Sequence, residues 1–147
     1  MVGILIVSHG RLAEALVSSV QFLVGKIKKI RGVSIWPRDS EKSIRRRIQR
    51  KIAQVDEGDG VLILTDILGG RPANLSFSFL EKYRTEVVTG VNIPMLVTLS
   101  SYRSEMSLED ISRLVKKSGR RSIVLAKGVL GWKGRPKAEG QVDESLS

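Results

Sequence analysis

The sequence predicts an α/β fold in which a parallel sheet of four strands is covered by helices. Residues 2–7 and 61–64 are uninterrupted apolar runs, which are typical of strands buried on both faces. The segments between the strands carry apolar residues at helical spacing. Strands that alternate with helices favour parallel pairing, because each helix returns the chain to the edge where the previous strand began. The length of 147 residues corresponds to one domain.

The strands are predicted from apolar runs that turn residues interrupt. Residues 2–7 form the first strand, which leads into Ser8 and His9. Short β-branched runs at residues 33–37 and 86–91 form the second and fourth strands. Along the chain they come before and after the third strand, at residues 61–64. Residues 122–126 are apolar and β-rich, and they predict a fifth strand after the last helix.

The helices are predicted from apolar periodicity and from capping residues. Asp39 or Ser40 can cap a helix whose isoleucines recur at four-residue intervals. Ser107 begins a capping-box pattern, although the box prefers Glu or Gln where this chain has Asp110. Five helices are expected, at about residues 12–24, 40–55, 72–83, 94–103 and 107–118.

The composition narrows the class of function. With no cysteine and a single histidine, a disulfide framework and a thiolate or multi-histidine metal site are excluded, and we expect no metal and no cofactor. Met1 leads straight into an apolar strand, and no apolar run reaches the roughly 18 residues that span a bilayer. We therefore expect a cytoplasmic protein with no direct membrane insertion.

The charge and the C-terminal composition are less ordinary. A net charge of +10 indicates an acidic partner or a polyanion, or it serves only solubility. The arginine-rich helix at residues 40–55 favours a solvated face over nucleic-acid binding, and no specific nucleic-acid partner is expected. After Lys127 the chain becomes rich in Gly, Lys and Pro. The expected organisation is an α/β domain at residues 1–127 and a mobile polar tail at residues 128–147.

His9 and Asp66 are the candidate catalytic pair. We expect the strand order 2-1-3-4, which makes the first and third strands neighbours and opens a cleft at their carboxyl ends. His9 ends the first strand and Asp66 the third, so the two side chains should meet. A carboxylate bonded to one imidazole nitrogen fixes the tautomer and leaves the other nitrogen as a nucleophile.

The turn after Asp66 suits an anion. Gly69 and Gly70 permit a tight turn, and Pro72 is favoured in the first turn of the helix that follows. A helix N-terminus offers unpaired N–H groups and a partial positive charge. An imidazole nucleophile beside such a terminus favours phosphoryl transfer, and no nucleotide-binding glycine motif is present.

Three stretches carry a resemblance to a known family. Residues 6–13, 64–74 and 90–96 resemble, in this order, the signature stretches of the mannose-family enzyme IIA domains of the phosphoenolpyruvate-dependent sugar phosphotransferase system (PTS). The similarity extends to about residue 127. Family membership would imply a fifth, antiparallel strand exchanged across a homodimer, at residues 122–126 here.

The resemblance also implies a function. His9 would take a phosphoryl group from the phosphocarrier HPr and pass it to a IIB partner, which we expect on a separate chain. Asp66 would orient the His9 ring, and the neighbouring glycine turn would receive the phosphoryl oxygens. The expected phosphoryl-binding residues are Gly10, Thr65, Gly69, Gly70 and Arg71.

One residue departs from the family pattern, and one other hypothesis remains. Where the family has Ser or Thr, this chain has Arg71, which would stabilise a phosphohistidine, alter the choice of partner or simply face solvent. The alternative hypothesis is a basic module that binds nucleic acid or an acidic protein, with His9 idle. The three signature stretches favour the phosphocarrier, whereas the net charge alone favours the binding module.

Overall fold

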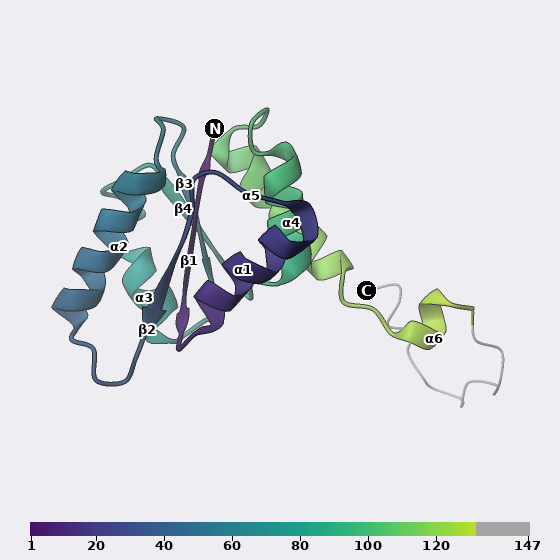
Figure 1. Ribbon diagram of the computed structural model, residues 1–147, viewed down its shortest axis with the longest axis horizontal. Helices are drawn as coiled ribbons and strands as arrows, with labels where there is room; N and C mark the ends of the chain where they lie inside the picture. Colours follow the sequence, from purple (N-terminus) through teal and green to yellow (C-terminus); the bar gives the residue numbers. More distant parts are fainter. Residues whose placement is uncertain (132–147) are drawn as a thin grey trace.

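Four parallel strands form the central sheet, in the order β2-β1-β3-β4 (Figure 1). The computed structural model describes residues 1–131. The strands are β1 (Gly3–His9), β2 (Ile30–Ile35), β3 (Val61–Thr65) and β4 (Thr85–Thr89). The predicted α/β class, the parallel pairing and the 2-1-3-4 order are confirmed. As expected of a sheet covered on both sides, β3 is buried along its whole length.

Helices cover both faces of the sheet and create two apolar cores (Figure 1). One face is covered by α1 (Leu12–Val24), α4 (Ile93–Tyr102) and α5 (Leu108–Arg121). The other face is covered by α2 (Glu41–Val55) and α3 (Arg71–Phe77). Successive side chains of a strand point to opposite faces, so each buried strand contributes to both cores.

Capping side chains begin three of the helices. The Ser40 hydroxyl accepts the Ser43 N–H at 3.1 Å, and the Ser107 hydroxyl accepts the Asp110 N–H at the same distance. Asn92 begins α4 by accepting the Met95 N–H at 3.1 Å, and its amide also donates to the carbonyl of Gly119 in α5. These side chains satisfy N–H groups that the helix backbone leaves unpaired. The predicted caps at Ser40 and Ser107 are confirmed.

The structure corrects two element boundaries. The helix predicted over residues 72–83 ends at Phe77, and turns follow it. There the Ser78 hydroxyl donates to the Leu75 carbonyl at 2.6 Å, a local bond that competes with a continued helix. The helix predicted to stop near residue 118 continues through a last turn to Arg121.

Residues 122–126 form no strand within the described chain. Residues 122–125 follow α5 as an irregular segment, and Ala126 begins α6 (Ala126–Val129), which lies away from the sheet in Figure 1. A strand needs a neighbour for its backbone hydrogen bonds, and this segment pairs with no strand of the described chain. Of the predicted tail, residues 128–131 are described and partly helical, whereas residues 132–147 lie outside the described residues.

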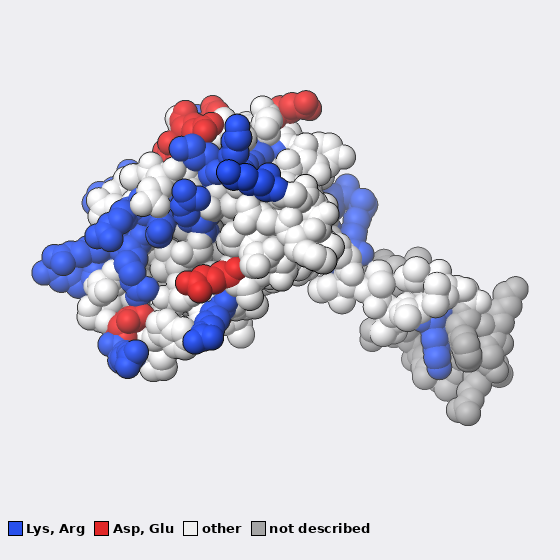
Figure 2. Space-filling model, viewed as in Figure 1, with Lys and Arg blue, Asp and Glu red and all other residues white. Residues whose placement is uncertain are grey.

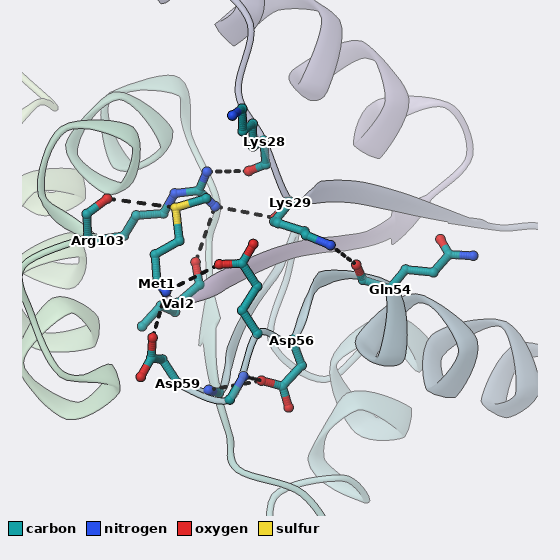
Figure 3. Close-up of polar contacts among 12 residues, drawn as sticks. Met1, Val2, Lys28, Lys29, Gln54, Asp56, Asp59 and Arg103 are labelled. Carbon is teal, nitrogen blue, oxygen red and sulfur yellow. Dashed lines mark hydrogen bonds and ion pairs between the residues drawn. The ribbon is translucent and has the colours of Figure 1, made fainter.

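Arg103 connects three segments at the amino ends of the strands, whereas His9 lies at a carboxyl end (Figure 3). It follows α4, and its side chain is only 4% exposed. Its guanidinium donates to the carbonyls of Val2 at 3.2 Å and Lys29 at 3.3 Å, and also to that of Lys28. Burial lowers the pKa of the Arg103 guanidinium, and the nearby Glu57 opposes this shift. The three carbonyl contacts hold the end of α4 against the starts of β1 and β2.

Replacing Arg103 with Met should destabilise the fold without touching the site. The substitution keeps an apolar chain but removes the donor from buried carbonyls, which typically costs about 1–3 kcal/mol. The free energy of unfolding in urea would measure this loss. Arg113→Met, at an exposed position of α5 with a 3.4 Å contact to Asp110, is the matched control and should change stability by less than about 0.5 kcal/mol. Equal stability of the two variants would contradict this role of Arg103.

Candidate functional site

His9 and Asp66 meet at the carboxyl edge of the sheet. β1 pairs with β3 in a register that places Val7 beside Thr65, so the residues that follow lie on neighbouring strand ends. The His9 Nδ1 atom lies 2.8 Å from Asp66 Oδ2, and the same oxygen accepts the His9 backbone N–H at 3.0 Å. The His9 side chain is 52% exposed and that of Asp66 only 14%. The convergence predicted for these two residues is therefore present.

The surroundings of Asp66 determine which imidazole nitrogen is free. Burial alone would raise the pKa of Asp66, but hydrogen bonds from the His9 backbone, the His9 ring and the Ile67 N–H lower it overall. An ionised carboxylate only accepts hydrogen bonds, so His9 Nδ1 carries the proton in the neutral ring. The lone pair then lies on Nε2, which is the ring nitrogen that remains free to accept a bond.

The glycine turn lies directly against the ring. A Cβ atom placed on Gly70 would come within 2.7 Å of His9 Cε1 and 3.2 Å of Nε2, so any side chain there would displace the imidazole. Gly69 has φ +89°, a conformation that glycine adopts without strain. Gly70 is also the N-cap residue of α3. The turn thus brings bare backbone to the free ring nitrogen.

Gly10 and Thr65 have different surroundings. Gly10, at φ +55°, follows His9, and a Cβ there would lie 3.8 Å from the Trp36 ring. Thr65 is fully buried, and its hydroxyl has no hydrogen-bond partner among the described residues. Its carbonyl accepts the Val91 N–H at 3.0 Å. Thr65 therefore lies beneath the site rather than on its exposed surface, and its predicted contact with a phosphoryl group stays a prediction.

Arg71 reaches to the loop between β2 and α2. Its guanidinium donates to the Trp36 carbonyl at 2.7 Å and to the Asp39 carbonyl at 2.8 Å. Asp39 in turn accepts the Trp36 N–H at 2.9 Å and a bond from Arg47 at 2.7 Å. This network favours a positioning role for Arg71 in holding the loop beside His9. Direct contact of Arg71 with a phosphoryl group stays a prediction.

The sequence analysis missed four exposed apolar side chains, here called the apolar ring, on the segments next to the strand end that carries His9. Leu12 begins α1, Trp36 follows β2, and Ile67 and Leu68 lie in the turn after Asp66. Their exposed fractions run from 41% for Trp36 to 68% for Leu68. Each is unremarkable in its own segment, and the only available signal was its position next to a predicted strand end.

Residues 1–131 contain neither a candidate metal site nor a candidate membrane-spanning helix. No group of three or more His, Asp or Glu side chains is arranged to hold a metal ion there. No helix in the same residues is long and apolar enough to cross a membrane.

The chain is similar in sequence to components of the PTS. The family described as "PTS system fructose IIA component" matches residues 3–116. The mannose-specific EIIAB component of Escherichia coli K12 is 31% identical over 124 residues, which are 83% of this chain and 38% of that protein. The fructose-specific EIIA component of Bacillus subtilis is 28% identical over 84% of this chain and 85% of its own length. The chain thus spans well under half of the E. coli relative.

Solved structures give the same result. EIIA from Streptococcus agalactiae superposes with a TM-score of 0.78 at 28% identity, covering 85% of this chain and 97% of that one. The IIA protein associated with the fucose utilization operon of Streptococcus pneumoniae gives a TM-score of 0.73 at 31% identity, covering 87% and 95%. With the matching sequence family, these likenesses show that the chain belongs to the PTS fructose IIA component family.

Proposed function

We propose that the chain is a phosphotransferase component that carries a phosphoryl group on His9 Nε2. The observation that carries this proposal is the 2.8 Å contact between His9 Nδ1 and Asp66 Oδ2, with an exposed ring beside the bare backbone of Gly70. The contact assigns the proton of the neutral ring to Nδ1 and leaves the Nε2 lone pair available, as a nucleophile requires. Membership of a PTS IIA family supports phosphoryl transfer over other nucleophilic chemistry.

The proposed donor is phosphorylated HPr, and the proposed acceptor is a IIB protein on a separate chain. The Nε2 lone pair attacks the phosphorus, a new N–P bond forms, and the electron pair of the broken bond returns to the donor nitrogen. Asp66 holds the ring proton on Nδ1 and stabilises the positive charge that develops on the ring. Transfer to IIB reverses these steps with IIB as nucleophile. Gly69 and Gly70 would receive the phosphoryl oxygens on backbone N–H groups, whereas the Gly10 N–H already donates to the Ile35 carbonyl at 2.9 Å and Gly10 would leave room beside the phosphoryl group.

His9→Ala should abolish phosphorylation while leaving the fold intact. His9 is the only imidazole in the chain, and its side chain is half exposed, so its loss removes the nucleophile at little structural cost. Incubation with phosphoenolpyruvate, enzyme I and HPr, followed by intact mass measurement, should show one acid-labile phosphoryl group on the wild type only. An acid-labile label that persisted in His9→Ala would refute the assignment.

Asp66→Asn should slow phosphorylation at least ~10-fold, equivalent to about 1.4 kcal/mol of transition-state stabilisation. The two carboxylate oxygens accept from three donors, namely the His9 N–H, the His9 ring and the Ile67 N–H. An amide in either orientation turns its NH₂ group toward at least one of these donors. Rapid-quench kinetics would measure the loss, with Glu105→Gln, an exposed carboxylate in the turns after α4, as the matched control.

The same substitution should alter the acid stability. Because the folded-state pKa of Asp66 is lowered, its contribution to stability is complete above the unfolded value of ~3.9 and is lost as pH falls through the folded value. Denaturation of wild type and Asp66→Asn should therefore differ near neutral pH and converge in acid. A constant difference across this range, with wild-type transfer kinetics, would show that the contact is absent in solution.

We also propose a homodimer in which residues 122–126 pair with the partner's sheet. Ile123, Val124 and Leu125 are 78%, 55% and 56% exposed in the single chain, an unusual exposure for three consecutive apolar residues. β4 is an edge strand of the four-stranded sheet, so one of its sides has unpaired backbone groups. A fifth strand from a second copy would satisfy that edge and cover the apolar residues.

Light scattering tests the dimer. The wild type should have twice the 16.2 kDa mass of one chain, whereas a chain ending at residue 121 should be monomeric or insoluble. Ile123→Asp with Leu125→Asp in the full chain provides a milder disruption, and Lys116→Asp with Lys117→Asp on α5 is the control. A wild-type monomer at the concentrations of the transfer assay would contradict the proposal.

A further inference from the structure

The edge of the sheet that presents His9 carries an excess of unpaired positive charge. Arg11 precedes α1, Arg38 lies in the loop after β2, and Lys42 and Arg46 lie on the first turns of α2. All four are exposed, and none makes an ion pair within the part of the chain that the structure describes. Figure 2 shows Lys and Arg side chains running across the region of α2 at the left of the view.

The carboxylates of this edge are mostly occupied. Asp66 is bonded to His9, and Asp39 is bonded to Arg47 and to the Trp36 N–H. Glu41 is paired with Arg45 at 2.7 Å. Among the described residues of the loops and first helical turns at this edge, Glu14 is the one acidic side chain without such a contact. The edge therefore presents mainly positive charge to an approaching molecule.

The positive residues, which we call the cationic flank (Arg11, Arg38, Lys42 and Arg46), adjoin the apolar ring of Leu12, Trp36, Ile67 and Leu68. Arg11 and Leu12 are consecutive, and Arg38 lies two residues after Trp36. An apolar centre bordered by charge is the usual anatomy of a transient protein interface. Contacts to nucleic-acid phosphates come from basic and polar groups, so the exposed apolar side chains favour a protein partner over a nucleic acid.

We propose that the carrier protein that exchanges phosphoryl groups with His9 docks through an acidic surface. Carboxylates on that surface would face the cationic flank, and an apolar patch around its own reactive residue would cover the ring. This inference rests on the proposed function, because that function requires a protein partner to reach Nε2. Complementary charge would act mainly on the association rate, which makes the encounter sensitive to salt.

Charge-reversal variants distinguish an effect of this surface on binding from an effect of the protein's net charge. Arg38→Glu with Arg46→Glu changes the flank, and Lys116→Glu with Lys117→Glu makes the same charge change at exposed positions of α5, on the other face of the sheet. Calorimetry from 50 to 300 mM salt would measure the affinity for unphosphorylated HPr and IIB from the organism that encodes this protein. Wild-type affinity should fall with salt, and the flank variant should bind at least ~10-fold more weakly at low salt.

The α5 control should stay within about twofold of the wild type, and Lys substitutions of the partner's carboxylates should impair wild-type binding and partly restore that of the flank variant. Salt-independent binding, or equal losses in the two variants, would overturn the proposal. Tighter binding of duplex DNA than of either protein, lost in the flank variant, would also overturn it in favour of a nucleic-acid surface. Because binding is measured without phosphate, a failure of docking is distinct from a failure of His9 to accept a phosphoryl group.

Discussion

The parallel pairing of β1 with β3 is the interaction on which the site depends. It brings two residues that are far apart in the sequence to adjacent strand ends, so that one carboxylate oxygen bonds both the backbone and the ring of His9. A register shift of one residue would turn every β1 side chain to the other face of the sheet. The apolar residues of both strands, packed between two helical layers, exclude that shift. The site geometry is thus a product of core packing.

The sequence predicted those parts of the structure that local pattern determines. Continuous apolar runs marked the buried strands, and Ser40 and Ser107 marked helix starts, because a cap acts within three residues of itself. His9 and Asp66 were found because both follow buried strands of a parallel sheet. The strand at residues 122–126 could not be settled in the same way, because strand formation depends on a neighbour and not on the segment alone.

The direction of Arg71 also lay beyond the sequence. Its long side chain crosses to carbonyls of another loop, a contact that only the packing of α3 beside that loop makes possible. Backbone bonding to Trp36 lowers the pKa of Asp39, against the effect of burial, and the Arg47 contact lowers it further. The Ser or Thr that the family resemblance implies at this position would be too short to reach those carbonyls. Arg71 therefore holds the backbone of the loop that follows β2.

The two hydrogen bonds that one Asp66 oxygen accepts have a consequence for how partners reach the site. Asp66 Oδ2 accepts from both the ring and the backbone N–H of His9, and the backbone of Gly70 lies close to Cε1 and Nε2, so the ring is bounded on two sides. In the proposed transfer, a donor and an acceptor that both need this nitrogen would occupy the same space in turn. A donor complex that persisted would exclude the acceptor, so the proposed carrier would work fastest with partners that leave quickly. Weak, short-lived association of both proposed partners is thus expected from a histidine held by Asp66.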